Sequence, residues 1–528
     1  MSLAESNLPN VVDELKRLLD EERVLTDDYE RVLYAQDVHT RAKPALAVVR
    51  PVDTAELASA VAAITEAGHA VVARGGGMSY TSGYVPKEDS SVIIDTQLMD
   101  QVLEVNSEDM YVTVQCGCTW KTLHDALEGK GLRTPFWGTL SGIQATVGGG
   151  LSQNCIFWGS ARHGTVADSV ISLDVVLADG TVVSTGANAQ KHGSPFFRHF
   201  GPDITGLFTA DTGALGVKAT ATLRLIPVSR HHEYLSFNFA EDKSLIAAMS
   251  EISRAGLADE CFAFDPYLAS LRMERDSMLS DVKKLAGVMK AGGSVSGAIK
   301  EGARVAMAGR RFMKDVQYSL HISIEERVAA TAQAGAEEVR GICGRHGGSE
   351  IENSIPKILR ANPFTPLNNV VGPNGERWSP VHTIVPHSKA ASTVAAVEEL
   401  FARHKEAIDK HGIGVGFLLA TVSTNGFVVE PVLYTPHELT EIHKETIEPP
   451  VLKRMACFEA NPEAMEVTTR LREEFADLCS ESGGIHMQIG KLYRYREGLA
   501  PESWRVVDKI KAALDPERRV NPGSLGLD

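Results

Sequence analysis

The clearest candidate for chemistry is a glycine-rich segment, Arg74-Gly75-Gly76-Gly77-Met78-Ser79-Tyr80, with Gly83 shortly after it. Glycine has no side chain, so its backbone can curl closely enough to point several N–H groups at one anion. The diphosphate of a dinucleotide requires such a cradle. The segment has neither the GxGxxG spacing of a Rossmann loop nor the Gly-Lys-Ser/Thr ending of a Walker loop, which predicts a nucleotide site of another type.

Two further small-residue segments strengthen this prediction. Gly138-Thr139-Leu140-Ser141-Gly142 leads into Thr146-Val147-Gly148-Gly149-Gly150, and a third glycine-hinged segment runs from Gly206 to Val217. Two loops with accessible backbone groups and small hydroxyls can hold an extended dinucleotide from both sides.

The elements around the first loop predict an α/β arrangement. Apolar residues at helical spacing predict an amphipathic helix over residues 11–34, and short apolar runs predict strands at 45–49 and 71–74. Asp53 supplies a helix start between these two strands. Because the glycine loop follows the second strand directly, it lies at the carboxyl end of a strand, where ligands bind in such folds.

More strands are predicted along the rest of the first half. They lie at 92–95, 111–115, 169–177, 182–184 and 217–226, with Asp179-Gly180 as a hairpin turn between two of them. From residue 233 strands alternate with longer helices, and a helix at 501–514 precedes the tail.

The bulk composition is typical of a globular protein with more than one domain. The chain has 528 residues, which exceeds the usual size of one hydrophobic core, with 43% hydrophobic and 23% charged residues. The net charge of −15 argues against binding to nucleic acid, because phosphates require a basic surface. Seven cysteines without CxxC pairs, no secretory signal and no apolar run of membrane-spanning length predict a cytoplasmic protein with free thiols.

One segment differs in charge from the rest of the chain. Residues 283–314 hold eight lysines and arginines against a single acid, Glu301, and several glycines interrupt them. Such a stretch predicts peripheral contact with anionic lipid or an acidic partner. A lid or a solvated helix is the simpler interpretation, and both stay open.

The motifs, taken in order, resemble the FAD-binding domain of the vanillyl-alcohol oxidase/p-cresol methylhydroxylase (PCMH) flavoprotein family. The resemblance covers about residues 40–228 strongly and the rest of the chain loosely. The matching segments are Ala73–Gly77, Thr146–Gly150, Arg162-His163-Gly164, Val175–Gly180, Gly206–Pro227 and the tail Leu514–Gly523.

The resemblance implies an α+β fold in three parts. A two-subdomain PCMH-type FAD-binding domain takes residues 1–228, and an α+β substrate (cap) domain with an antiparallel sheet takes 229–480. Residues 481–528 then return to the FAD-binding domain.

The resemblance also implies which residues hold FAD. Gly75, Gly76, Gly77, Ser79 and Tyr80 are expected to bind the diphosphate. The other residues expected around the flavin and adenosine are Arg74, Met78, Gly83, Gly138, Ser141, Thr146, Gly149, Asn154, His163, Gly164, Val217, Lys491 and Asn521.

Covalent attachment of the flavin is not expected. Some relatives tether the flavin through a histidine in the first glycine loop, where this chain has Met78. Others use a histidine or tyrosine shortly before a Ser-Pro-Val element, and residues 373–377 before Ser379-Pro380-Val381 contain neither. We therefore predict non-covalent FAD.

Oxidation of an alcohol by a flavin requires a base for the hydroxyl proton, and histidine suits that role at neutral pH. His486 is the first candidate and His382 the second, since both lie in segments that resemble the substrate side of the family. Arg494, in the cationic and aromatic run 491–496, is a candidate for binding a carboxylate or phenolate. A solvent-facing position explains Arg494 equally well.

Two specialised devices of the family are incomplete in this chain. The metal-dependent 2-hydroxy-acid branch carries a histidine-containing Gly-Asp-Gly-Asn-Leu-His element and a Glu-His pair. Here residues 421–430 contain no histidine, and Ile485 precedes His486, so no metal site is expected. The phenol-oxidising branch has a Tyr-Arg pair where Gly483-Gly484 stand.

The sequence therefore predicts an FAD-dependent oxidase or dehydrogenase that transfers hydride from a CH–OH donor, such as a 2-hydroxy acid or an aromatic or benzylic alcohol, to flavin N5. Oxidation of a para-alkylphenol and a redox-silent enzyme of the alkyl-dihydroxyacetone-phosphate synthase type are alternatives, as is a binding module that has lost the cofactor. Expected partners are a small-molecule substrate and oxygen, a quinone or a protein as electron acceptor. A homo-oligomer is left open.

Overall fold

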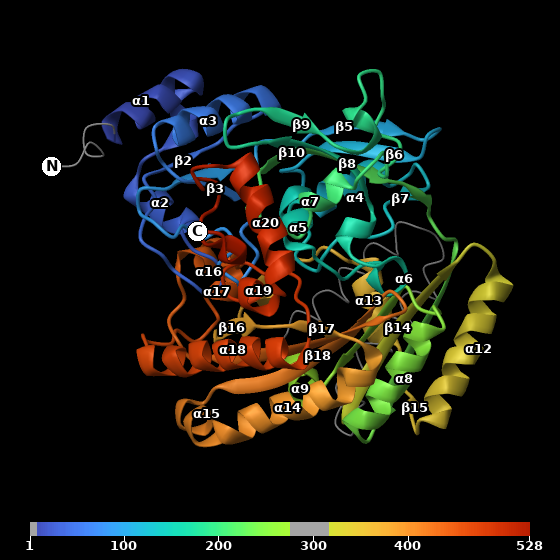
Figure 1. Ribbon diagram of the computed structural model, residues 1–528. Helices are drawn as coiled ribbons and strands as arrows, with labels where there is room; N and C mark the ends of the chain where they lie inside the picture. The colour runs from blue at the N-terminus through green and yellow to red at the C-terminus, as the bar shows by residue number, and fades with distance from the viewer. Residues whose placement is uncertain (1–7, 275–315) are drawn as a thin grey trace.

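The computed structural model describes residues 8–274 and 316–528. The basic segment 283–314 lies outside the described residues. The first half of the chain forms a four-stranded and a five-stranded sheet, and the second half forms an eight-stranded sheet below them in Figure 1.

The four-stranded sheet carries the first glycine loop. Its order is β1-β2-β4-β3, with β2, β4 and β3 parallel and β1 antiparallel to β2. The strands are β1 (Val24–Leu25), β2 (Ala47–Val49), β3 (Val71–Arg74) and β4 (Val92–Asp95). Helices α1 (Leu8–Leu18) and α3 (Thr54–Glu66) pack apolar side chains against this sheet, and Asp53 caps α3 as predicted.

The prediction of a single helix over residues 11–34 is wrong. The structure has two helices there, α1 and α2 (Asp28–Tyr34), with a turn of 3-10 helix and β1 between them. Val24 and Leu25, which the helical periodicity placed inside one helix, form β1 and pair with β2 instead. Asp27 then starts α2 by accepting a hydrogen bond from the Tyr29 N–H.

The five-stranded sheet is antiparallel and has the order β5-β6-β10-β8-β9. Its strands are β5 (Val102–Asn106), β6 (Tyr111–Gln115), β8 (Val170–Val176), β9 (Val182–Ser184) and β10 (Val217–Arg224). The strand predicted over 217–226 is divided, because Ile226–Pro227 forms β11 and pairs with β7 (Leu132–Arg133) instead. Helices α4 (Trp120–Leu127), α5 (Val147–Gln153), α6 (Ser160–His163) and α7 (Ile204–Leu207) connect the strands.

The eight-stranded sheet is antiparallel, which confirms the predicted antiparallel sheet of the second half. Its order is β15-β12-β14-β13-β18-β19-β16, and β17 also pairs with β19. The strands are β12 (His231–Phe239), β13 (Glu260–Phe264), β14 (Tyr318–Glu326), β15 (Ser349–Glu350), β16 (Arg377–Pro380), β17 (Thr383–Val385), β18 (Gly414–Val422) and β19 (Gly426–Thr435).

Helices lie on both faces of this sheet. The outer helices are α8 (Asp242–Arg254), α12 (Ala329–Arg345), α14 (Ala390–Arg403), α15 (Lys405–His411) and α18 (Pro462–Ser482). The inner face meets α9 (Pro266–Glu274) and α13 (Ser354–Ala361), and the remaining short helices are α16 (Glu441–Thr446), α17 (Pro449–Leu452) and α19 (Tyr495–Gly498). The alternation of a strand separates the two faces: Leu419 and Val429 join the outer core, whereas Ala420 and Val428 join the inner one.

A buried charge cluster connects the first half of the chain to the large sheet. Arg133 of β7 lies 3.3 Å from the Glu325 carboxylate and 3.7 Å from that of Asp259. Arg360 of α13 pairs with the other Glu325 oxygen, and its guanidinium lies over the Trp137 ring, 4.7 Å from the ring centroid. Buried charges are tolerated when they are paired in this way, so the cluster holds the two halves in register.

The C-terminal segment returns to the four-stranded sheet after α20 (Pro501–Leu514), the red helix in Figure 1. The Val71 N–H donates to Arg519 O at 2.8 Å, and the Asn521 N–H donates to Val71 O at 2.7 Å. Lys511 is fully buried, and its Nζ donates to the Asp515 carboxylate and to the carbonyls of Ala214 and Val520. The tail thus packs beside the strand that carries the glycine loop.

Replacing Lys511 by alanine is expected to destabilise the protein by about 3–5 kcal/mol, because the buried Asp515 carboxylate loses its cation. The free energy of unfolding from urea denaturation measures this. Lys405→Ala, which removes an exposed pair with Asp409 at the same i,i+4 spacing, is the matched control and should cost less than about 0.5 kcal/mol. Equal losses in the two variants would show that burial of the Lys511 pair contributes nothing.

Candidate functional site

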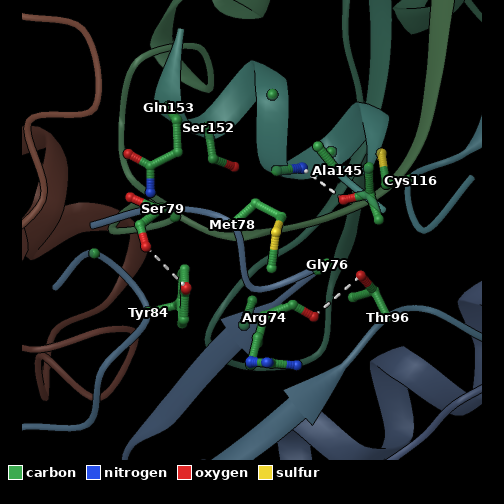
Figure 2. Close-up of a pocket in the computed structure, with 18 of the residues that line it drawn as sticks. Arg74, Gly76, Met78, Ser79, Tyr84, Thr96, Cys116, Ala145, Ser152 and Gln153 are labelled. Atoms are coloured by element: carbon green, nitrogen blue, oxygen red, sulfur yellow. Dashed lines mark hydrogen bonds between the residues drawn. The ribbon is translucent and has the colours of Figure 1, made fainter. Parts of the chain in front are cut away.

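The first glycine loop has backbone donors that no protein atom uses. In the part of the chain that the structure describes, the N–H groups of Gly75 to Ser79 donate no hydrogen bond to another residue. The loop begins where β3 ends and borders a cavity (Figure 2). Unpaired donors beside a cavity are suited to an anionic ligand.

The two predicted loops touch each other through glycine. A Cβ on Gly75 would overlap Thr146 Oγ1, and a Cβ on Gly76 would overlap the Gln144 carbonyl oxygen. The Gln144 side chain in turn donates to Gly76 O at 2.8 Å. Any larger residue in this part of the first loop would separate it from the second.

Arg74 supports the loop from its other side. Its guanidinium lies 4.5 Å from the Tyr34 ring centroid and 5.6 Å from that of Tyr84. Gly77 has a positive φ of 71°, and a Cβ there would overlap this guanidinium. Arg74 therefore braces the curl of the loop by packing.

The cavity beside these loops has a volume of about 120 Å³ and is lined by all three glycine segments. Figure 2 shows Met78 in its centre, with Ser152 and Gln153 of α5 on one side and Cys116 on another. The predicted residues that line it are Arg74, Gly75, Gly76, Gly77, Met78, Ser79, Gly83, Ser141, Thr146, Gly149 and Val217.

Six other predicted cofactor residues lie outside the cavity walls: Gly138, Asn154, His163, Gly164, Lys491 and Asn521. Asn521 donates from its side chain to Gly83 O at 2.8 Å and to Thr212 O at 2.7 Å, and so ties two wall segments together. Lys491 donates to Val85 O at 2.5 Å, and burial lowers its pKa to about 8. As direct contacts to FAD these six stay predictions.

A second, larger cavity of about 900 Å³ adjoins the first and lies against the inner face of the large sheet. Both cavities are lined by Met78, Thr139, Ser141, Cys155 and Gln488, so they meet at these residues, which we call the junction. Tyr80 also lines the larger cavity. Most of its wall is apolar and includes Ile156, Phe157, Leu268, Leu271, Ile355, Leu359, Leu418, Val432 and Met487.

Glu430 is a carboxylate on this apolar wall, and it was not among the residues predicted from the sequence. It lies in the middle of β19, on the same face as Val432 and Tyr434. Burial raises the pKa of the Tyr80 hydroxyl well above its usual value, and the negative charge of Glu430 raises it further. Tyr80 lies at the junction end of the cavity, where its hydroxyl accepts a hydrogen bond of 2.9 Å from Gln488.

A sequence signal for Glu430 exists. It is the only charged residue in the strand Gly426–Thr435, whose other members are apolar, proline, glycine or threonine. Gln153 and Gln488 were also missed, although Gln153 stands beside the predicted Asn154. Asn154 ends α5 with a left-handed φ of 49°, so the preceding residue, Gln153, borders the cavity instead.

The two predicted histidine bases lie behind the cavity wall. His486 stacks on Tyr493 with ring centroids 3.7 Å apart, and its Nδ1–H donates to His382 O at 2.8 Å. Burial lowers the pKa of His486 to about 4, so its imidazole is neutral near pH 7. His382 is fully buried, burial lowers its pKa as well, and neither ring nitrogen has a partner among the described residues.

Arg494 lies away from both cavities. Its guanidinium pairs with Asp477 at 2.8 Å, and more than a third of its side chain is exposed, at 37%. Its role in binding a carboxylate or phenolate therefore stays a prediction without support from the geometry.

No three histidine, cysteine, aspartate or glutamate side chains within residues 8–274 and 316–528 gather closely enough to hold a metal ion. Over the same residues, we find no helix with the length and apolar character that crossing a bilayer requires.

Known proteins support the assignment of the glycine loops. A family model described as an FAD binding domain matches residues 45–186. The chain is 24% identical to a probable mitochondrial D-lactate dehydrogenase of Danio rerio. The match covers 98% of this chain and 91% of that protein. Together these similarities support a PCMH-type FAD-binding oxidoreductase family for this chain.

Other relatives are more similar to this flavoprotein, over a smaller share of the chain. The mitochondrial D-lactate dehydrogenase [cytochrome] of Arabidopsis thaliana is 33% identical over 47% of the chain, and the match spans less than half, 44%, of that protein. The glycolate oxidase subunit GlcD of Bacillus subtilis is 32% identical over 34% of the chain and 37% of its own length.

Solved structures agree on the PCMH-type fold. p-Cresol methylhydroxylase with substrate bound superposes with a TM-score of 0.74 at 16% identity, over 99% of this chain and 98% of that one. The 4-ethylphenol oxidase of Gulosibacter chungangensis in complex with isoeugenol gives 0.73 at 17% identity, over 99% and 97%. An alkyldihydroxyacetonephosphate synthase gives 0.68 at 16% identity, over 97% and 84%.

The residues present fit FAD, which is the cofactor of this flavoprotein. The unused N–H groups of Gly75 to Ser79 suit a diphosphate, and Gln153 Oε1 is a buried acceptor without a protein partner. At the cavity wall, Lys218 forms a buried ion pair of 2.7 Å with Asp211. This pair holds the third segment, since Asp211 also accepts a hydrogen bond from the Gly213 N–H.

Replacing Gly76 by alanine is expected to weaken FAD binding by about 1–3 kcal/mol, or roughly five- to 150-fold, because the added Cβ pushes the two loops apart. The FAD dissociation constant, measured by flavin fluorescence with the refolded apoprotein, checks this. Gly344→Ala, at a helical position with nothing within 4 Å of the added Cβ, is the control. Unchanged affinity in Gly76→Ala would contradict a role for this loop contact.

Proposed function

We propose that this flavoprotein oxidises a donor that carries a CH–OH group on a sizeable apolar body. The observation that supports this most is the apolar cavity of about 900 Å³ that meets the glycine-loop cavity at the junction. Drug-sized ligands occupy pockets of about 300–1,000 Å³. A flavin ring at the junction takes part of this volume, and lactate or glycolate would fill little of what is left.

The similarity to D-lactate dehydrogenases and to a glycolate oxidase subunit favours a hydroxyl-bearing donor. To bind a 2-hydroxy acid, the cavity also requires a positively charged side chain that pairs with the carboxylate of the acid. Among the described residues that line the larger cavity, Arg454 is the only lysine or arginine, and it is exposed. We infer that an acidic donor would place its carboxylate at Arg454 and its apolar part along the wall.

Bound FAD supplies the hydride acceptor, and the protein must supply a group that takes the hydroxyl proton. Glu430 is our candidate, because it is a carboxylate on the wall of the cavity near Tyr80 and the junction. His486 and His382, predicted from the sequence, do not line the cavity. We assign them to positioning, since His486 holds Tyr493 by stacking and Tyr493 accepts from the His382 N–H at 2.8 Å.

We further propose that FAD is bound without a covalent bond. Met78 stands in the first glycine loop at the position where some relatives carry the histidine that tethers the flavin. Cys155 lies at the junction, but burial raises the pKa of its thiol far above neutrality, so it is not a thiolate there. Flavin that stays with acid-precipitated protein would contradict this proposal.

The electron acceptor, the location and the assembly stay open predictions. Oxygen, a quinone or a protein can each reoxidise a flavin, and the cavity does not distinguish them. A cytoplasmic location is still our expectation, although the Arabidopsis and Danio relatives are named mitochondrial. A homo-oligomer likewise stays a prediction.

Anaerobic addition of donors is expected to bleach the flavin absorbance, and long-chain 2-hydroxy acids or aromatic alcohols should act at lower concentration than lactate. The physical reason is the apolar wall, where each buried methylene contributes about 0.8 kcal/mol. The measurement is a spectral titration over a series of increasing chain length. Bleaching by lactate alone would contradict the apolar donor, and no bleaching by any alcohol would favour the redox-silent alternative.

Glu430→Gln is expected to slow flavin reduction by about 10²–10⁴-fold, since the amide cannot take up the hydroxyl proton. Stopped-flow spectroscopy at saturating donor measures the reduction rate, and flavin content checks that the site still holds FAD. Glu448→Gln, an exposed carboxylate on the wall of the same cavity, is the control and should change the rate little. A wild-type rate in Glu430→Gln would remove Glu430 as the base.

A further inference from the structure

Away from the two cavities, one surface of the molecule exposes large apolar side chains to solvent. The segment 190–203, which we call the aromatic loop, follows β9, the edge strand of the five-stranded sheet, and leads into α7. Phe196, Phe197 and Phe200 in this loop are 57%, 54% and 57% exposed. Ile204 and Leu207 of α7 continue the exposed apolar surface. None of these residues lines either cavity.

Hydrogen bonds and an ion pair hold the second half of the aromatic loop. The Ala187 N–H donates to Phe197 O at 2.8 Å. Arg198 pairs with Asp203 at 2.8 Å, and Asp203 also accepts from the Gly206 N–H at 2.9 Å, which caps α7. The three phenyl rings thus lie on the outside of a loop with its own internal hydrogen bonds.

The aromatic loop is slightly basic, because it contains Lys191 and Arg198 against a single acid, Asp203, which pairs with Arg198. No aspartate or glutamate occurs between Asp179 and Asp203, although the chain has a net charge of −15. The same stretch contains Lys191, His192 and His199, all exposed. Exposed aromatic rings beside basic residues favour the interface of a membrane with anionic headgroups.

We propose that the aromatic loop docks this protein on an anionic lipid bilayer, with Phe196, Phe197 and Phe200 inserted at the headgroup level. A second copy of the chain fits this surface less well. A two-fold interface would place the basic residues of one loop beside the same residues of the other. A bilayer with anionic lipid accepts both the rings and the positive charge.

Cosedimentation of the FAD-loaded full chain with vesicles tests this proposal. Vesicles of equal parts phosphatidylglycerol and phosphatidylcholine should bind the wild type at low salt, and pure phosphatidylcholine vesicles should bind it more weakly. The triple variant Phe196→Ser, Phe197→Ser and Phe200→Ser should bind the anionic vesicles about tenfold more weakly or worse, because three apolar side chains no longer leave water.

The matched control removes three apolar side chains that are equally exposed elsewhere. Leu103→Ser, Val328→Ser and Val506→Ser, at 53%, 58% and 59% exposure, should bind vesicles as the wild type does. Flavin content and unfolding temperature should be unchanged in the aromatic-loop variant, since the loop lines neither cavity.

Three results would overturn the proposal. They are no binding of the wild type to anionic vesicles, equal binding by the wild type and the aromatic-loop variant, and equal binding to neutral and anionic vesicles. Self-association of the wild type that the aromatic-loop variant abolishes, measured without lipid by sedimentation velocity, would assign the loop to contact between copies instead.

Discussion

The contact between the two glycine loops is the constraint on which the rest of the site depends. Gly75 and Gly76 approach Thr146 and the Gln144 carbonyl so closely that a single Cβ would separate them. That approach leaves the N–H groups of the first loop facing the cavity without protein partners. A diphosphate site made of backbone donors requires such a surface, because side chains would occupy the space that the phosphates need.

The elements around the loops hold this contact in place. Arg74 braces the curl of the first loop between two tyrosine rings, and the tail pairs with Val71 on the strand that leads into it. Asn521 and the buried Lys511 connect the tail to the wall segments. A small cofactor cavity is therefore built from residues that are hundreds of positions apart in the chain.

We propose that the large sheet forms the donor side of the site. Its inner face is apolar, and its cavity meets the glycine-loop cavity at residues such as Met78, Cys155 and Gln488. Glu430 places a carboxylate on that face by the alternation of β19. Proteins named for lactate, glycolate, cresol and ethylphenol are similar to this chain in sequence or in fold, so the fold alone does not fix the donor.

The sequence by itself determined the glycine loops and strands such as 71–74, 92–95 and 111–115, because glycine content and side-chain periodicity act locally. The antiparallel second sheet was expected only from the family resemblance, because local periodicity does not say which strands pair. Only the tertiary structure decided that residues 11–34 divide into two helices, since β1 pairs with a strand more than twenty positions away. It also decided that Gln153, Gln488 and Glu430 border the cavities while His486 and His382 lie behind them. Which face of a segment meets a cavity depends on sheet register and on contacts between distant segments, and neither is encoded in local spacing.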